Sequence, residues 1–390
     1  MRILVWVIVI LWITFGSLSF GIAGANYLWA RRAVKKGWEI DKDKRYMPTV
    51  SIIVPTYNES SVIGYKLRNI SKLVYPRSLM QFVFVDSHST DATVDIIRNF
   101  AKKNTSMNIK IIVENERKGK THALNVALKD CSGDVIVVSD ADCFWPPEIL
   151  NDSLCYLAEP SIGAISGPKV LLNKEDSWVT QNESKYLESM NSIKLGESKT
   201  YSTIFFEGGF AAFSKTALEA FDPYNTGSDD CGTVIKVLER NRRAIMVPEA
   251  RFYTFFPKSW KGKTDIKIRR AVQLIRVLRE YLALLSRGKI KAAKNMVLRY
   301  AFLYFFAPTV FLCFIATTIF LMLTVPFAIL LLSILLIPNV NAYLIEAMSG
   351  FLVMSVASLL AVFKKKSLLW KEPEDRKLVE EQPLMKAGLV

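Results

Sequence analysis

Two carboxylates separated by one residue, Asp140 and Asp142, follow an apolar run from Val135 to Ser139. At the end of a strand, carboxylate oxygens at this spacing can bind a hard divalent cation that also contacts a diphosphate. A solvated loop, or the first turn of a helix, can show the same pair of acids without any metal. The elements that position the pair therefore decide between these interpretations.

Strand-like apolar runs alternate with helical stretches between residues 47 and 257. The predicted strands are Val50 to Pro55, Gln81 to Asp86, Lys110 to Glu114 and Asp134 to Asp140, and the predicted helices are Ser61 to Lys72, Ala92 to Lys103 and Lys120 to Asp130. The alternation predicts an α/β fold with a doubly wound, mostly parallel sheet. Such sheets bind their ligands beyond the carboxyl ends of the strands.

Three polar clusters fall at those predicted strand ends. They are Pro55 to Glu59, Asp86 to Asp91 and Asp140 to Asp142. Their convergence predicts a pocket for a nucleotide diphosphate, while the sequence has neither the glycine pattern of a dinucleotide site nor that of a P-loop. Lys118 belongs to a basic turn that opens a helix and can bind phosphate, although a solvated turn would have the same composition.

Long apolar segments lie on both sides of this domain, at residues 3–27, 301–337 and 342–363. Each can cross roughly 30 Å of hydrocarbon as a helix, and Pro326 divides the second, which is too long for one upright helix. Basic residues follow the first and last segments, namely Arg31, Arg32, Lys35 and Lys36, and Lys364 to Lys366. Because basic flanks stay on the cytoplasmic side, we expect a multi-pass protein of the cell membrane with three crossings and a cytoplasmic domain. The stretch from Pro326 to Asn341 is then bent, tilted or at the outer interface; four crossings, or a signal peptide at the N-terminus, are the alternatives.

The formal net charge of +15 is concentrated between Lys258 and Arg299, directly before the second apolar segment. Apolar residues at helical spacing there predict basic interfacial helices beside anionic membrane lipids; these residues are Ile268, Val272, Ile275, Leu278 and Leu282. Binding of nucleic acid is not predicted, because no aromatic and basic recognition module is present. The five cysteines show no paired metal spacing, and Cys143 and Cys231 are interpreted as packing residues. Only two histidines are present, which excludes a multi-histidine metal site.

The order of the motifs resembles that of the membrane-bound family 2 glycosyltransferases, the cellulose-synthase-like group with a GT-A fold. The resemblance covers about residues 50–279. The similar stretches are Val50–Glu59, Val85–Asp91, Lys118–Asn125, Asp140–Asp142, Phe206–Phe213, Ser228–Asp230 and Gln273–Val277. Each motif is weak by itself, and their common order is the stronger signal.

The resemblance implies a donor site, a metal site and an acceptor site. The residues implied to bind the nucleotide sugar are Pro55, Tyr57, Glu59, Asp86, Lys118, Asp140, Gln273 and Arg276. Asp140 and Asp142 would bind Mn²⁺ or Mg²⁺, and Gly208, Gly209 and Asp229 would face the acceptor. Asp230 would take the position of the catalytic base, although a helix N-cap also fits this segment. For Arg276, a lipid-facing or solvated cation on an interfacial helix is the alternative.

Val277 stands where the polymerising members have a tryptophan that stacks on the growing chain. This departure and the few membrane segments weaken a processive role. The resemblance then implies inverting, metal-dependent transfer of a single sugar to a polyprenyl or dolichyl phosphate carrier, with GDP-mannose as the leading donor. The alternatives are a polysaccharide synthase of the cellulose, chitin or hyaluronan type that uses a UDP-sugar, and a catalytically silent membrane scaffold, against which the intact acids Asp142 and Asp230 argue.

The predicted organisation has six parts. They are an N-terminal transmembrane helix (1–30), a basic linker (31–46), a GT-A catalytic domain (47–257), interfacial helices (258–299), a C-terminal transmembrane region (300–363) and a cytoplasmic tail (364–390). The tail is charged and contains proline, so we expect it to be loosely ordered.

Overall fold

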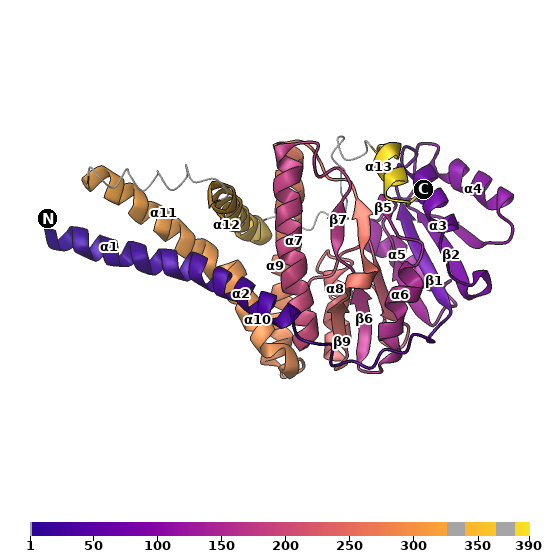
Figure 1. The fold of residues 1–390 in the computed structure, drawn as a ribbon, viewed down its shortest axis with the longest axis horizontal. Helices are drawn as coiled ribbons and strands as arrows, with labels where there is room; N and C mark the ends of the chain where they lie inside the picture. The colour runs from indigo at the N-terminus through magenta and orange to yellow at the C-terminus, as the bar shows by residue number, and fades with distance from the viewer. Residues whose placement is uncertain (1, 326–339, 364–378) are drawn as a thin grey trace.

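The computed structural model describes residues 2–325, 340–363 and 379–390. A seven-stranded sheet forms the centre of the domain, in the order β3-β2-β1-β4-β8-β6-β9 (Figure 1). Its strands are β1 (Val50–Thr56), β2 (Met80–Asp86), β3 (Asn108–Val113), β4 (Val135–Val138), β6 (Ile162–Ser166), β8 (Ala211–Ser214) and β9 (Arg243–Met246). Only β8 runs antiparallel to its neighbours β4 and β6, so the predicted mostly parallel α/β sheet is confirmed.

Helices cover both faces of this sheet, which is why its strands are apolar along almost their whole length. The helices of the domain are α3 (Ile63–Ser71), α4 (Thr93–Lys103), α5 (Lys120–Leu128), α6 (Ile149–Leu154) and α8 (Cys231–Glu239). Successive side chains of β1 point to opposite faces, and Ile52 and Ile53 therefore belong to two different hydrophobic clusters. The four strands and three helices predicted from the first part of the sequence are confirmed, with ends shifted by a few residues.

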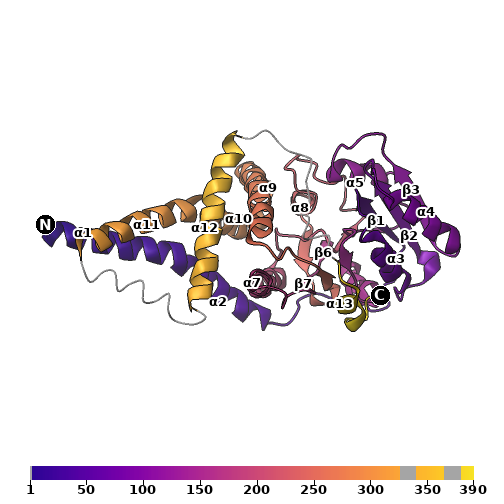
Figure 2. The same ribbon diagram turned by 90° about the horizontal axis from the view of Figure 1, so that it is seen from above.

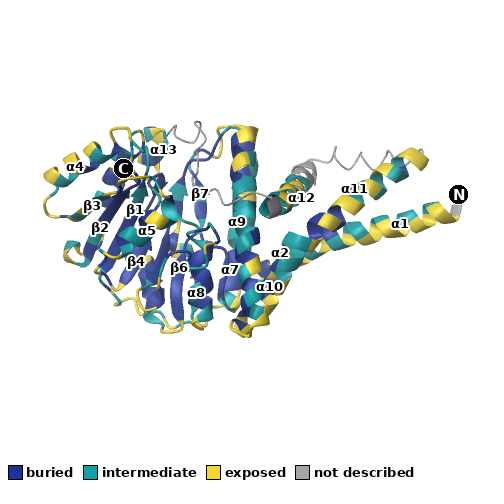
Figure 3. Cartoon of the chain, turned by 180° about the vertical axis from the view of Figure 1, so that it is seen from behind, coloured by how far each residue is buried: buried dark blue, intermediate teal, exposed yellow. Residues whose placement is uncertain are grey.

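A small second sheet, in the order β5-β10-β7, lies beside the end of β4. Its strands are β5 (Cys143–Phe144), β7 (Lys169–Leu171) and β10 (Phe252–Thr254). Because β5 begins directly after Asp142, this sheet fixes the course of the chain that carries the acidic pair. Burial is deepest in the central strands of the seven-stranded sheet, whereas the edge strand β3 stays partly exposed (Figure 3).

A layer of long helices separates the sheets from the apolar part of the molecule. It consists of α7 (Trp178–Thr200), α9 (Trp260–Ser286) and α10 (Lys294–Ala301). The predicted apolar stripe of α9 is only partly correct. Ile275 and Leu278 are buried, but Val277 and Tyr281 are buried as well, because α9 packs on the domain core instead of resting on lipid alone.

Among the residues that the structure describes, two helices are long and apolar enough to cross a membrane, Ile3–Val34 and Lys291–Thr324. The first comprises α1 (Arg2–Gly16), a π-helical turn and α2 (Ile22–Val34); the second contains α10 and α11 (Ala307–Thr324). The indole of Trp12 on α1 stacks on Phe314 of α11, and its Nε1 donates a hydrogen bond of 2.8 Å to Thr318. The outer sides of these helices are largely exposed (Figure 3).

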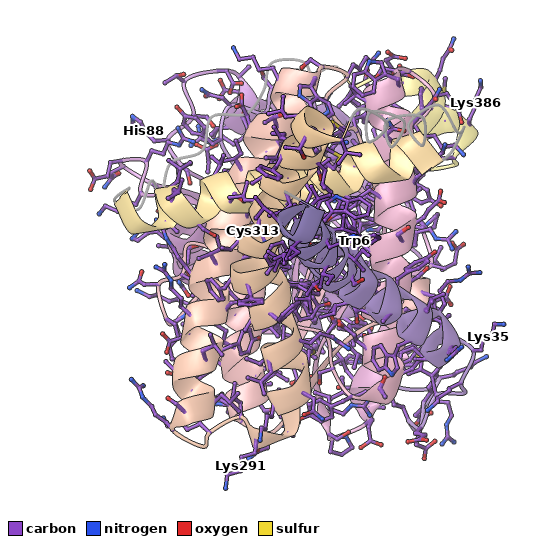
Figure 4. The ribbon with its side chains drawn as sticks, turned by 90° about the vertical axis from the view of Figure 1, so that its left-hand side faces the viewer. Trp6, Lys35, His88, Lys291, Cys313 and Lys386 are labelled. Atoms are coloured by element: carbon purple, nitrogen blue, oxygen red, sulfur yellow. The ribbon has the colours of Figure 1, made fainter. Side chains whose placement is uncertain are left out.

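The expected third crossing is not evident, since α12 (Val340–Phe363) lies across α1 and α11 instead of beside them (Figure 2). The view along α1 and α11, with Trp6 and Cys313 near its centre, shows the same crossing (Figure 4). α12 packs on α9, where Ala357 contacts the cluster of Ala271 and Ile275. Hydropathy measures the length of an apolar helix and carries no information on its direction. The predicted break at Pro326 and the basic flank Lys364 to Lys366 lie outside the described residues.

The expectation of a loosely ordered tail is wrong for residues 379–390. This segment returns to the domain and contains the short helix α13 (Glu381–Lys386). Leu384 and Leu389 are buried against Val62, Phe144 and Phe255. Two leucines in a charged segment are a weak sequence signal, but their burial stabilises the docked conformation.

Candidate active site

A cavity of about 1510 Å³ opens where the parallel strands end. It extends from the loops after β1, β2 and β4, past the N-termini of α5 and α8, to α9 and α12. Of the residues expected to form the site, the cavity wall includes Pro55, Tyr57, Glu59, Lys118, Asp140, Asp142, Gly208, Asp229, Asp230 and Gln273. The walls of this one cavity do not include Asp86, Gly209 and Arg276.

The acidic pair lies at the centre of the wall. Asp142 is 8% exposed, and oxygens of Asp140 and Asp142 lie within 4.8 Å of each other and of the sulfur of Cys143. The thiol of Cys143 donates to Asp142 at 3.6 Å, so it acts as a buried neighbour of the pair. Two carboxylates fit a hard cation such as Mn²⁺ or Mg²⁺, which prefers oxygen ligands.

Lys120 connects the acidic pair to the segment before α8. Its Nζ lies 2.6 Å from Asp140 Oδ1 and 2.6 Å from Asp229 Oδ2. Burial alone would lower the pKa of Lys120, but the two carboxylates raise it above its ordinary value. Burial raises the pKa of Asp229, and Lys120 opposes this effect. Sequence reasoning placed Lys118 to Lys120 in a basic turn that can bind phosphate, but it chose only Lys118 as a site residue; the position of Lys120 as the first residue of α5 was the available signal.

Two glycines allow the loop before β8 to approach this centre. A Cβ on Gly208 would lie 3.0 Å from Lys120 Nζ and 3.1 Å from Asp140 Oδ2. A Cβ on Gly209 would lie 2.1 Å from the ring of Phe252. Gly209 is buried behind the cavity wall, where its carbonyl accepts a hydrogen bond of 2.7 Å from the indole of Trp145. Gly208 therefore borders the site, and Gly209 shapes the loop.

Asp230 is the N-cap of α8 and also lines the cavity. Its Oδ1 accepts hydrogen bonds from Cys231 N at 2.6 Å and Ser228 Oγ at 2.5 Å. The predicted N-cap and the expected position beside the reaction site are thus compatible. Asp229 and Asp230 together make this helix start strongly acidic, and Lys120 offsets part of that charge.

The nucleotide end of the cavity is formed by Pro55, Tyr57 and Glu59 from the loop after β1. The guanidinium of Arg117, which sequence reasoning missed, lies 3.7 Å from the centre of the Tyr57 ring. Such a stacked pair offers a flat, cationic surface to a base or a phosphate. Lys118 also lines this end, and its ammonium lies 2.8 Å from Glu116.

Asp86 does not reach the cavity in the way that the resemblance implies. It is fully buried, and its carboxylate accepts hydrogen bonds from Thr56 Oγ1 at 3.0 Å and from Ser89 N at 2.8 Å. These bonds join the ends of β1 and β2. In this structure Asp86 therefore holds the nucleotide loops together from behind.

The helix α9 places Gln273 and Arg276 beside the segment before α8. The amide of Gln273 donates to the carbonyl of Gly227 at 2.5 Å, and Arg276 Nη1 lies close to the same glycine. Val277, one residue further, is fully buried in the domain core. The position of the polymerase tryptophan thus faces away from the cavity.

A polar middle section, which sequence reasoning missed, lies between the acidic centre and α12. Glu207 pairs with Lys194 at 2.5 Å and Arg270 at 4.0 Å. Burial alone would raise the pKa of Glu207, but these cations lower it to about 2. A second cluster joins Lys263 to Glu183 of α7 at 3.4 Å and to Glu346 of α12 at 2.8 Å. The ring of Tyr186 lies beside Lys267 in the same section.

The far end of the cavity is apolar. It is lined by Phe20, Ala23, Leu303, Phe351, Val353 and Met354, from the π-helical turn before α2, α2 itself, the turn before α11, and α12. The ring of Phe20 contacts that of Phe351 edge to face at 5.8 Å. A single cavity therefore joins a charged centre to an apolar region between the long helices.

Residues 51–221 match the family described as Glycosyl transferase family 2. The chain contains a family 2 glycosyltransferase domain. This domain has the GT-A fold, and the predicted glycosyltransferase domain is confirmed. Sequence reasoning placed the domain at 47–257, which includes the matched residues.

Over 92% of this chain and 100% of the other, the structure is similar to mannosyltransferase PcManGT from Pyrobaculum calidifontis in complex with GDP-Man and Mn²⁺, with a TM-score of 0.80 and 29% identity. Parts of the chain are also similar to curated enzymes, two of which differ in the product that their names state. One is the dolichyl N-acetyl-alpha-D-glucosaminyl phosphate 3-beta-D-2,3-diacetamido-2,3-dideoxy-beta-D-glucuronosyltransferase of Methanococcus voltae, 30% identical over 33% of this chain and 40% of the relative. The other is the poly-beta-1,6-N-acetyl-D-glucosamine synthase of Staphylococcus aureus, 23% identical over 65% of this chain and 61% of the relative. The chain spans 27% to 63% of the length of eight such curated relatives.

Proposed function

We propose that the protein transfers a single mannose from GDP-mannose to a lipid-linked acceptor of the polyprenyl or dolichyl type. The observation that carries this proposal is the single cavity that joins Asp140 and Asp142 to apolar side chains of α2 and α12. The likeness to the mannosyltransferase solved with GDP-Man and Mn²⁺, which extends over nearly the whole chain, supports the choice of donor.

The donor end binds and neutralises the diphosphate. Asp140 and Asp142 would hold Mn²⁺ or Mg²⁺, and the bound cation supplies positive charge against the departing diphosphate. Lys118 adds a second cation at the start of α5, where the helix N-terminus also favours an anion. The Tyr57 and Arg117 pair provides a surface for the base.

Asp230 is proposed as the group that orients the acceptor nucleophile. Its carboxylate lines the cavity next to Asp229, where it can accept the proton of an acceptor hydroxyl in a single inverting displacement. A phosphate nucleophile is already ionised near neutral pH and needs no base. With such an acceptor, Asp230 would position the nucleophile and offset positive charge on the sugar.

The acceptor is proposed to enter from the apolar end of the cavity. An isoprenoid chain fits between Phe20, Leu303 and Phe351, and a polar head fits the section around Glu207 and Tyr186. The relative from Methanococcus voltae is named for a dolichyl-linked acceptor. We therefore propose a multi-pass protein of the cell membrane whose catalytic domain lies on the cytoplasmic side, in contact with membrane lipids.

A processive polysaccharide synthase is the second candidate, because a poly-N-acetylglucosamine synthase is among the similar proteins. Against it, Val277 is buried in the core and offers no stacking surface to a growing chain. Product size distinguishes the two candidates. Single addition gives one labelled lipid product, and polymerisation gives a ladder.

The proposal is tested with membranes that contain the full chain. Labelled GDP-mannose and Mn²⁺ are supplied with dolichyl phosphate or with dolichyl-linked saccharides, and extraction into organic solvent measures transfer. We expect one added mannose, which EDTA abolishes and Mn²⁺ restores. A parallel series with UDP-sugars identifies the donor. Transfer only from a UDP-sugar would contradict the assignment of GDP-mannose as the donor. No transfer from any donor would refute the proposal that the protein transfers a sugar.

A further inference from the structure

The C-terminal segment, residues 379–390, lies behind the loop that carries Asp140 and Asp142. This loop, residues 139–145, is called the metal-binding loop, and the segment covers its side that faces away from the cavity. Leu384 and Leu389 are 0% and 1% exposed, and they complete a hydrophobic cluster with Val62, Phe144 and Phe255. Phe144 belongs to β5, directly after the acidic pair, and Val62 precedes α3. The segment thus packs on β5, which is part of the metal-binding loop, and on the start of α3, which follows the loop after β1.

The local sequence produces this docked shape. After α13, Gly388 adopts a positive φ of 69°, which glycine adopts without strain, and Leu389 N then donates to Leu384 O at 2.9 Å. The turn brings Leu384 and Leu389 to the same side. Two ion pairs hold the beginning of the segment, Arg68 with Glu381 at 2.7 Å and Lys258 with Glu380 at 3.3 Å.

Asn69 connects the docked segment to the metal-binding loop. Its Nδ2 donates to the carbonyl of Leu389 at 2.8 Å and to the carbonyl of Trp145 at 2.8 Å, and its Oδ1 accepts from Trp145 N at 2.9 Å. Trp145 in turn donates from its indole to Gly209 O at 2.7 Å. An unbroken chain of buried contacts therefore runs from Leu389 to the loop beside the acidic pair.

Lys66, one helical turn before Asn69, strengthens the same attachment. It is fully buried, and its Nζ donates to Ser139 Oγ at 2.5 Å and to Cys143 O at 2.6 Å. The ammonium also lies 4.5 Å from the centre of the Trp145 ring. These contacts hold the residues before and after Asp140 and Asp142 on the buried side of α3. A loop held from behind in this way needs little reorganisation when it binds a cation.

We propose that residues 379–390 are a positioning element for the metal-binding loop, which acts through Asn69 and Trp145. The docked segment limits the motion of residues 139–145, and its release weakens the binding of Mn²⁺ without removing a ligand. This inference rests on the proposed metal site. It adds a role for the C-terminus that the proposed transfer reaction does not require.

The test compares two variants of the full chain in lipid nanodiscs. Leu384→Ser with Leu389→Ser removes the buried contacts, and Met385→Ser, at an exposed position of the same helix, is the matched control. Amide hydrogen exchange of residues 139–145 and the Kd of Mn²⁺ in the presence of GDP are measured. We expect both to rise by about tenfold in the double variant, as for loss of a residue that supports metal ligands, and to stay unchanged in the control.

A milder variant guards against loss of folding. Glu380→Ala with Glu381→Ala removes only the two surface ion pairs, and it should change both measurements in the same direction by a smaller factor. Faster exchange confined to residues 379–390, with residues 139–145 and the Kd of Mn²⁺ unchanged, would overturn the proposal. The exchange measurement does not depend on sugar transfer. An enzyme that binds Mn²⁺ but transfers no mannose would thus refute the proposed function and leave the positioning element to be judged by exchange.

Discussion

Lys120 and Asp229 form an ion pair inside the cavity, with Nζ 2.6 Å from Oδ2, and the same ammonium lies 2.6 Å from Asp140. One cation thus serves carboxylates from the metal-binding loop and from the start of α8. Replacement by methionine keeps the length of the side chain and removes its charge. We expect Lys120→Met to fold and to lower kcat by about 100-fold, as for loss of a preorganised charge at a reaction centre. Lys120→Arg, which keeps the positive charge, is the control. If Lys120→Met were as active as the wild type, the ion pair would not be needed for transfer.

Replacement of Asp142 separates metal binding from folding. Asp142→Asn keeps the volume of the side chain and removes one anionic ligand. We expect the Mn²⁺ concentration for half-maximal activity to rise by at least about tenfold, with an unchanged melting temperature. Activity measured against a Mn²⁺ series after EDTA treatment checks this. An unchanged Mn²⁺ dependence would remove Asp142 from the metal site.

The two roles of Asp230 can be separated by choice of substitution. Asparagine is as good an N-cap as aspartate, whereas alanine loses the cap and costs about 1 kcal/mol of stability. Asp230→Asn should therefore melt like the wild type, bind GDP normally and transfer sugar slowly. Asp230→Ala should lose both stability and transfer. Calorimetry, GDP binding and transfer assays on both variants separate the two roles. Full activity of Asp230→Asn would show that Asp230 acts only as the N-cap of α8.

The ion pairs of Glu207 make stability depend on pH. Its pKa lies at about 2 instead of 4.5, so the folded state binds the proton less readily than the unfolded chain. This corresponds to about 3 kcal/mol of stability that is fully present above pH 4.5 and is lost as the pH falls towards 2. Unfolding by denaturant between pH 6 and pH 3 should show this loss. In Glu207→Gln the free energy of unfolding should change less with pH over this range. The same pH dependence in the variant and the wild type would contradict the assignment of this effect to Glu207.

The position of Gly208 predicts a loss of activity without a loss of folding. A Cβ there would stand 3.0 Å from Lys120 Nζ and 3.1 Å from Asp140 Oδ2. The end of the lysine can move, so Gly208→Ala should fold. Displacement of reacting groups by about 1 Å can cost about 100-fold in rate, and we expect a reduction of up to that size. Mannose transfer and thermal melting of the purified variant, compared with Gly64→Ala at an open helical position, provide the test.

The sequence predicted those parts of the site that lie close to strand ends. Asp140 and Asp142 could be found because they follow a buried strand directly, and parallel strands place their carboxyl ends along one edge. The ion pair of Lys120 and Asp229 joins residues far apart in the chain, and no local pattern indicates it. Glu346 was hidden in a segment assigned to the membrane by its hydropathy. Its pairing with Lys263 depends on the direction of α12, which only the tertiary structure provides.

Asp86 shows the opposite limit. Its place at the end of β2 was correctly predicted, yet its side chain turns inward to Thr56 and Ser89. Sequence position defines the strand end, whereas the orientation of the side chain depends on hydrogen bonds that form only in the folded loop. A role in contact with the donor stays a prediction for this residue.

The burial of Val277 limits how such enzymes can change during evolution. A tryptophan at this point of α9 would add many atoms to a core that is already filled, at a cost of about 1–3 kcal/mol or more, and the backbone would have to shift. If position 277 corresponds to the tryptophan of the polymerising enzymes, as the resemblance implies, Val277→Trp alone is not expected to make the protein extend a sugar chain. A tryptophan at position 277 would first require α9 to repack against its neighbours, so a single substitution there would not by itself create a stacking surface.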